Sequence, residues 1–314
     1  FLHLSSPVDF IILDIAVFFG LLQILNKATI QGFARFFEFV VVGFIEAYGK
    51  LVLGVIAVLL GFGATGAYGA FIGIGAIGFL YTTYVISKIV PHKEKRTPIP
   101  IAPFLRKTIP TFFMTVGIMS LFNSDVILVR HYITAHEAGL YSALSVLGKI
   151  IFFGTSPIAS VMLPLVSAAV ARGENYHKIF FMSLLGTAVF SGVVVGAFAI
   201  GSAFVLQIFG AQYVDSSRYL VGFGLFISLC SLINVSVLFF FAIGRIIATY
   251  ALVITALVQI VGIVLFHQNL GQVVTVSLTA TASLMGFLLL YYVYAARETI
   301  ALRYRPNIWS GKNN

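Results

Sequence analysis

Long apolar stretches are the feature that most constrains how this chain can fold. From Leu51 to Val90 the sequence is largely apolar apart from a short Gly-rich break, and similar runs recur along its length. A helix needs about 20 apolar residues to cross a bilayer, whereas a membrane barrel strand alternates polar and apolar residues over roughly ten. The runs therefore predict an all-α fold, a polytopic transmembrane helical bundle.

The composition excludes several other classes of protein. Hydrophobic residues make up 60% of the chain and charged residues 9%, whereas a soluble domain is about a quarter charged. A soluble enzyme and a disordered chain are thereby excluded, and the single cysteine, Cys230, rules out a disulfide scaffold. The net charge of +9 would suggest nucleic acid in a soluble protein, but here we expect it to reflect positive cytoplasmic loops, with no nucleic-acid partner.

The apolar runs and the basic residues together predict a topology. Of the 19 lysines and arginines, 15 fall on one side of the predicted membrane and two on the other. The positive-inside rule makes the richer side cytoplasmic, together with the C-terminus. The nine predicted spans cover residues 8–31, 37–61, 66–90, 108–130, 137–171, 176–208, 213–242, 245–267 and 271–298.

These spans fall into four predicted regions. Residues 1–90 form three spans of a partial N-terminal lobe, and residues 91–107, with four prolines, form a cytoplasmic linker. Residues 108–300 form a C-terminal lobe of six helices, and residues 301–314 form a cytoplasmic tail.

An internal repeat links the two predicted lobes. The segments Gln31–Ser87 and Phe241–Ala295 resemble each other at an offset of 210 residues, each opening with a turn that ends in arginine. Both copies have the same predicted orientation, as in parallel-repeat transporters. Because this topology places Phe1 on the outer side, we expect a two-lobe fold whose first three spans are missing from this sequence.

Motifs for catalysis and cofactor binding are absent or lie in the wrong context. Gly73, Gly75 and Gly78 match the spacing of a dinucleotide fingerprint, but no strand precedes them. Small residues within an apolar span more commonly let helices pack closely. The sequence has no HExxH, CxxC or G-x-S-x-G motif, so we expect no enzymatic activity, no cofactor and no metal.

Polar residues inside the fifth span indicate a cavity. Lys149 lies twelve residues after Glu137, which places it about 18 Å along the helix at 1.5 Å per residue. A lysine at that depth normally faces a water-filled cavity or a partner carboxylate. The serines that share its predicted helix face are Ser142, Ser145, Ser156 and Ser160.

Acidic residues inside other spans add to the candidate site. Glu46 and Lys50 are spaced i,i+4 on the second span, which predicts an ion pair that is either structural or part of a cavity. Asp14 lies in the first span, and Asp125 in the fourth is either a cavity residue or an interfacial anchor. The predicted cavity residues are therefore Lys149, Lys50, Glu46, Ser142, Ser145, Ser156, Asp125 and Asp14.

Several segments resemble one known family. The chain is similar to the polysaccharide transporter branch of the multidrug/oligosaccharidyl-lipid/polysaccharide exporter superfamily over about residues 20–300. In that branch the seventh span ends in an aspartate followed by apolar residues, and a Gly-Leu-Tyr entry opens the eighth. The matching segments are Gln31–Arg35, Ser124–Arg130, Glu137–Ala143, Leu147–Lys149, Pro157 and Leu163–Ser167.

The resemblance implies a mechanism and a substrate. It implies two six-helix lobes around a central cavity, alternating access, and flipping of undecaprenyl-pyrophosphate-linked oligosaccharide across a bacterial cell membrane. Lys149 and Lys50 would then contact the pyrophosphate and the serines the sugars, with H⁺ or Na⁺ as a coupling ion left open.

Two alternative functions make different demands on the sequence. A cation-coupled multidrug exporter of the same fold would depend on a buried carboxylate, such as Asp14 or Glu46. An integral membrane glycosyltransferase or ligase would need a sizeable external loop with catalytic groups. The predicted outer turns are too short for that second alternative.

Overall fold

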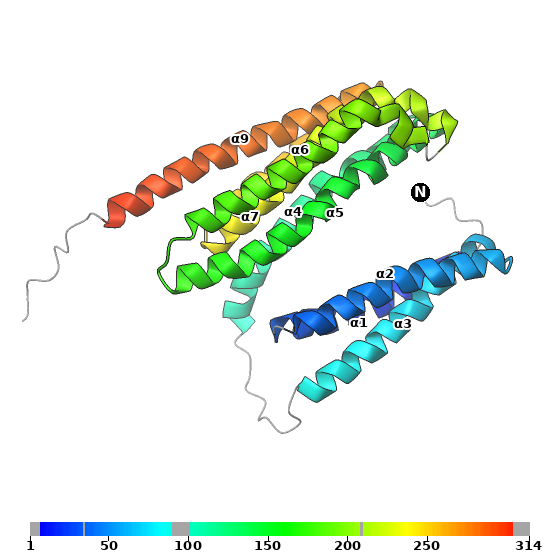
Figure 1. The fold of residues 1–314 in the computed structure, drawn as a ribbon, viewed down its shortest axis with the longest axis horizontal. Coiled ribbons are helices and arrows are strands. Elements are labelled where there is room, and N and C mark those ends of the chain that lie inside the picture. Colours follow the sequence, from blue (N-terminus) through cyan, green and yellow to red (C-terminus); the bar gives the residue numbers. More distant parts are fainter. Residues whose placement is uncertain (1–6, 34, 90–100, 208–209, 304–314) are drawn as a thin grey trace, which may run out of the picture. The chain divides into compact units, whose positions relative to one another are not determined.

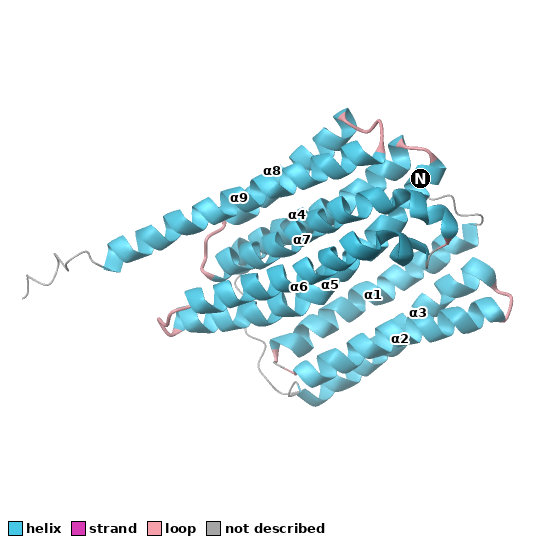
Figure 2. Ribbon diagram, turned by 45° about the horizontal axis from the view of Figure 1, so that its top comes forward, coloured by secondary structure: helices cyan, strands magenta, loops and turns pink. Residues whose placement is uncertain are grey.

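The chain is helical throughout the part that can be described. The computed structural model describes residues 7–33, 35–89, 101–207 and 210–303, and every regular element within these ranges is a helix (Figure 2). Nine of these helices are long and apolar enough to cross a membrane. The predicted all-α fold with nine spans is confirmed, and the protein is a multi-pass membrane protein.

The chain divides into two compact units, Phe1–Pro98 and Ile99–Asn314, each described here by itself. The first unit contains α1 (Pro7–Gly32), α2 (Phe36–Leu59) and α3 (Gly63–Ile89) (Figure 1). The second unit contains α4 (Ile101–Tyr132), α5 (Ala135–Ala171), α6 (His177–Gln207), the short 3₁₀ helix η1 (Ala211–Ser216), α7 (Ser217–Ala242), α8 (Ile247–Leu265) and α9 (Leu270–Arg303).

The predicted linker and tail fall largely outside the described residues. Of the linker over 91–107, residues 101–107 already belong to α4, and of the tail over 301–314, residues 301–303 belong to α9. The helix α4 begins seven residues before the predicted span at 108 because Pro103 lies in its first turn, where proline leaves no helical hydrogen bond unmade. The assignment of the two units as transporter lobes stays a prediction.

In the first unit, α3 packs against both α1 and α2. A sharp turn connects α2 to α3, with Gly61 at φ +88° and Gly63 at φ +56°. Residues with a side chain rarely adopt these left-handed backbone angles, so the two glycines let the chain reverse within three residues. The turn therefore lets α2 fold back along α3 in a compact helical hairpin.

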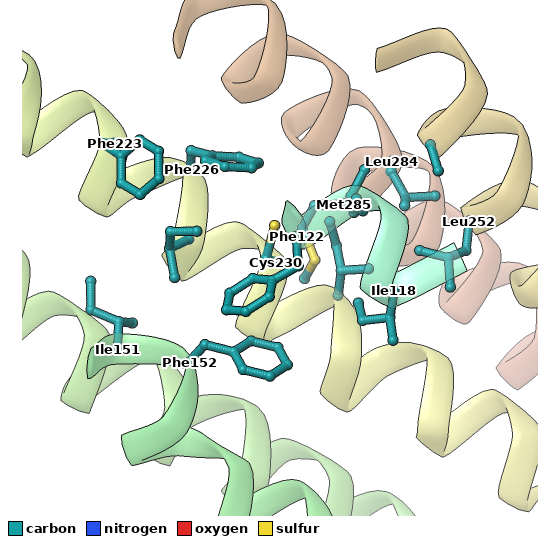
Figure 3. Close-up of a cluster of buried hydrophobic side chains, with 14 of the residues drawn as sticks. Ile118, Phe122, Ile151, Phe152, Phe223, Phe226, Cys230, Leu252, Leu284 and Met285 are labelled. Carbon is teal, nitrogen blue, oxygen red and sulfur yellow. The ribbon is translucent and has the colours of Figure 1, made fainter. Parts of the chain in front are cut away.

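In the second unit, α7 is the central helix, and it packs against α5, α6 and α9. Most of its apolar stretch is buried, 61% against 33% for α5 and α8. Figure 3 shows the cluster around it, in which Phe122 of α4 lies close to Phe152 of α5, with 4.3 Å between ring centroids. Local sequence sets the start of α5, because the hydroxyl oxygen of Thr134 accepts a hydrogen bond from the backbone N–H of Glu137.

The helices α1 to α3 recur as α7 to α9. The bounds of α1 and α7 differ by 210 residues at both ends, which is the offset of the predicted repeat. The turn after each helix has matching backbone bonds, Arg35 N–H to the Ile30 carbonyl at 3.1 Å and Arg245 N–H to the Phe240 carbonyl at 2.8 Å. In both sets the third helix packs closely on the first and second. This recurrence supports the internal repeat.

Candidate functional site

Lys149 of α5 lies within the membrane-spanning part of the second unit, where its direct contacts are an amide and an aromatic ring. Its Nζ donates a hydrogen bond to Oδ1 of Asn123 on α4 at 3.0 Å, and it lies 5.1 Å from the centroid of the Phe122 ring. Within the described residues Lys149 makes no ion pair. Lys149 is half-buried, and one hydrogen bond leaves it N–H donors for a ligand.

Asp125 lies two residues further along α4 but is a core residue of the unit. Its carboxyl group is fully buried, and Oδ2 accepts a hydrogen bond from the Tyr141 hydroxyl at 2.7 Å. Its other oxygen, Oδ1, is buried and has no hydrogen-bond partner. Asp125 is therefore part of the packed interior, and its role as a cavity residue or an interfacial anchor stays a prediction.

The predicted serine stripe on α5 divides between environments. Ser142 and Ser160 are exposed on the unit, Ser156 is half-buried, and Ser145 is buried. The hydroxyls of Ser142, Ser156 and Ser160 each donate to a backbone carbonyl of their own helix. Their oxygens can still accept hydrogen bonds. Ser145 faces the interior of the unit, and the role of the other serines as cavity residues stays a prediction.

The predicted ion pair between Glu46 and Lys50 is wrong. Glu46 instead pairs with Lys27 of α1, with Nζ at 3.0 Å from both carboxylate oxygens. Both side chains are 22% exposed, so the pair is largely shielded within the first unit. The sequence spacing pointed to the neighbour on the same helix, whereas packing of α1 brings in a nearer cation. Glu46 is thereby paired with Lys27, and among the described residues Lys50 has no acidic partner.

Lys50 lines an open hollow of about 270 Å³ in the first unit. Its ammonium lies 5.5 Å from the centroid of the Phe71 ring. A lysine at the centre of a membrane helix costs about 2.5–3.5 kcal/mol on insertion scales, and a cation–π contact offsets about 0.5–2 kcal/mol. The hollow is formed by α1, α2 and α3, with Leu13, Ala16, Val17, Gly20, Gln23, Lys50, Tyr68, Phe71 and Gly75 as its lining.

Gln23 of α1 is the second polar group of this hollow, and sequence reasoning missed it. The side chain is 4% exposed, and its amide nitrogen is buried without a hydrogen-bond partner. It lies against Gly78 of α3, where even a Cβ atom would collide with it. The signal available in the sequence was a glutamine within an apolar span, because such a residue normally seeks a partner inside the protein.

The lining of the hollow combines donors without an acid. Lys50 and the Tyr68 hydroxyl can donate hydrogen bonds, the Gln23 amide nitrogen is buried behind them, and none of the described lining residues is an aspartate or a glutamate. Asp14, also predicted as a cavity residue, is exposed on α1 and does not line the hollow. This donor set suits an anionic ligand or a ligand rich in hydroxyl and carbonyl oxygens.

A metal site has no support among the described residues, where no group of three histidines, cysteines or carboxylates could hold an ion. A family model described as a polysaccharide biosynthesis protein matches residues 4–218. The match spans α1 to α6 and includes both Lys50 and Lys149. Comparisons with curated proteins and with solved structures found no match.

Proposed function

The chain belongs to the polysaccharide biosynthesis protein family, and on that premise we propose that it flips undecaprenyl-pyrophosphate-linked oligosaccharide across a bacterial cell membrane. Transport would proceed by alternating access, and the protein would be a transporter and not an enzyme. The C-terminus would lie in the cytoplasm.

One observation carries this proposal: Lys50 in the first unit and Lys149 in the second lie within spans and form no ion pair among the described residues. Lys50 in the first unit contacts Phe71, and Lys149 in the second contacts Asn123 and Phe122. Hydrogen bonds and aromatic contacts offset only part of the cost of a membrane cation. A ligand that brings negative charge into the membrane removes the remainder, which is what a pyrophosphate group would do.

The size of the Lys50 hollow indicates which part of the substrate it would hold. Pockets for whole small molecules typically measure about 300–1,000 Å³. The open hollow of about 270 Å³ has room for a group comparable to one diphosphate or one sugar residue. We therefore assign it to the charged head of the substrate, with the remaining sugars outside it.

A multidrug exporter of the same fold is the alternative, and the state of the carboxylates argues against it. Glu46 is neutralised by Lys27, and Asp125 is buried against Tyr141. Of the candidate carboxylates, Asp14 alone is exposed on its unit. A cationic drug would therefore have one available carboxylate in the predicted site and two lysines that repel it.

The test is complementation in a strain whose own flippase is deleted, with surface polysaccharide as the readout. The complete gene would be compared with Lys50→Ala and Lys149→Ala, because each change removes one proposed phosphate contact. A charge-assisted hydrogen bond is worth about 1.5–3 kcal/mol, so each variant should lower the transport rate at least about tenfold. Lys88→Ala and Lys178→Ala are the matched controls, since both lysines are exposed on their units.

The outcomes separate the proposal from its alternative. Restored polysaccharide that is lost in the Lys50 and Lys149 variants, but kept in the controls, supports flipping and both contacts. If all four variants restore polysaccharide, the flippase function is supported, but Lys50 and Lys149 are not part of its substrate site. Absence of restoration, together with drug resistance that depends on Asp14, would replace the flippase by the exporter.

A further inference from the structure

A second polar hollow lies at one end of the second unit, away from Lys149. It has a volume of about 120 Å³, or roughly four water molecules at 30 Å³ each. The start of α6, the end of α7, the turn after α7 and α9 all contribute to it. Its lining residues are Tyr176, His177, Phe239, Phe240, Ile243, Arg245, Tyr292 and Ala295.

Aromatic rings hold the walls of this hollow in place. Nδ1 of His177 shares a hydrogen bond of 2.6 Å with the hydroxyl of Tyr292, which joins α6 to α9. The Tyr176 ring lies 4.6 Å from the His177 ring and 5.9 Å from the Phe239 ring. Because contacts between α6, α7 and α9 define these walls, the hollow is a feature of the packed unit and not of one loop.

Basic and hydrogen-bonding side chains line the hollow. Arg245 lines it from the turn after α7, where Gly244 adopts φ +77° and the Arg245 N–H bonds the Phe240 carbonyl. His177 and two tyrosine hydroxyls add further groups that can donate hydrogen bonds. None of the described residues that line it is an aspartate or a glutamate. A guanidinium group with its fixed fork of donors favours phosphate oxygens.

The hollow lies at the edge of the membrane. His177 is the first residue of its span, and Ala295 is the last residue of the span of α9. Arg245 follows the span that ends at Ala242 by three residues. Aromatic and basic residues at this level contact lipid headgroups, and basic pockets between membrane helices bind anionic headgroups.

We propose that this hollow binds the phosphate group of an anionic phospholipid, with Arg245 as the principal contact and His177 as the second. The aromatic walls would contact the glycerol and the first acyl carbons. The proposal concerns a lipid that stays with the protein, and it does not depend on the identity of the transported glycan. Free inorganic phosphate offers the same chemistry without the acyl chains, so the experiment includes it.

The test is lipid binding to the purified protein in detergent, followed by native mass spectrometry. Phosphatidylglycerol, phosphatidylcholine and inorganic phosphate would each be titrated against the wild-type protein, Arg245→Gln and Arg218→Gln. Arg218 is the matched control because it lies in the first turn of α7, at the opposite end from Arg245. Its guanidinium carbon also lies over an aromatic ring, 4.7 Å from the centroid of Tyr219. Loss of one charge-assisted contact should weaken phosphatidylglycerol binding about tenfold in Arg245→Gln.

The proposal is supported if phosphatidylglycerol binds more tightly than phosphatidylcholine and only Arg245→Gln weakens it. It is overturned if both arginine variants bind equally, or if inorganic phosphate alone binds as tightly as the lipid. Arg245→Lys guards against a folding defect, since it keeps the charge but loses the fork, and should show intermediate affinity. His177→Gln should lower phosphatidylglycerol affinity by a smaller factor, and an unchanged affinity would remove His177 from the site.

Discussion

The helices α1 to α3 and their repeat α7 to α9 share a backbone arrangement but differ in the size of the side chains at matching interior positions. Both sets place their third helix against the first two and turn after the first helix through matching hydrogen bonds. In the first set small residues line a hollow, and in the second, at an offset of 210 residues, larger side chains fill a core cluster. The small residues are Ala16, Gly20 and Gly75, and their counterparts are Phe226, Cys230 and Met285 (Figure 3).

The polar residues follow the same division. Lys50 and Gln23 of the hollow correspond to Ile260 and Ile233 of the second set. Ile233 is fully buried. The comparison teaches that one helical plan can serve as a packed support or as a lined site, and that side-chain volume and charge decide between them. The backbone hydrogen bonds of the turn need not change.

The largest effect on stability should come from removing a large buried side chain from the helices α7 to α9. Phe226→Ala removes a ring that is fully buried at the centre of the second unit, and we expect a loss of about 3 kcal/mol of stability. The value lies at the lower end for such a change because packing, and not burial from water, drives association in a membrane. Unfolding in denaturing detergent measures it, with Phe204→Ala, 72% exposed, as control. Equal losses in both variants would contradict a packed core.

The next effect concerns charge in the hollow. Lys50→Ile introduces the residue of the repeat, and we expect transport to fall at least about tenfold, because the proposed phosphate contact is lost. Stability should not fall, since removing a membrane lysine relieves about 2.5–3.5 kcal/mol. Complementation measures the effect on transport, and thermal unfolding measures the effect on stability. A less stable protein would mean that Lys50 is structural.

A smaller effect concerns the Lys27–Glu46 pair, whose counterparts are Val237 and Ala256. Glu46→Ala alone leaves Lys27 without this partner, and because both side chains are 22% exposed we expect a loss of about 1 kcal/mol, below that for a fully buried pair. The double change Lys27→Val with Glu46→Ala should restore most of that stability, because it removes both charges. Unfolding midpoints of the two single variants and the double variant measure the coupling, and additive losses would show that the pair contributes nothing.

The smallest effect concerns the volume of the hollow. A Cβ atom at Gly20 meets nothing within 4 Å, so Gly20→Leu should fold and occupy part of the space. We expect a reduction in transport of about threefold, or roughly 0.7 kcal/mol. Gly32→Leu is the control on the same helix, because Gly32 also has open space around it and does not line the hollow. Equal rates in both variants would remove the hollow from the transport path.

The sequence predicted the helices well because apolar length alone determines a membrane span. The ends of α5 and α6 lie within two residues of their predicted positions. The start of α4 differs from the predicted start at 108 because basic residues and prolines are typical of loops, although a helix tolerates proline in its first turn. The repeat was also predictable, since its offset is visible in the residues themselves.

The partners of the site residues could not be predicted in the same way. Glu46 pairs with Lys27, nineteen positions away, and not with Lys50 on the same helix. The packing of the helices, and not the spacing along one helix, determines which charges meet. Asn123 and Tyr141 became part of the candidate site only when α4 and α5 were placed side by side. Spacing within one helix carries no information about such contacts, so the hollow around Lys50 required the structure.

The close approach of Gln23 and Gly78 has a consequence for the evolution of the family. Because the end of the Gln23 side chain occupies the space that a Cβ at position 78 would need, a larger residue there requires that amide to move. A relative with alanine at position 78 should therefore more often carry a shorter residue at position 23, and a relative that keeps glutamine should more often keep glycine. The two columns should therefore covary in an alignment of related sequences, and that covariation would mark which relatives retain the amide donor beside the lysine.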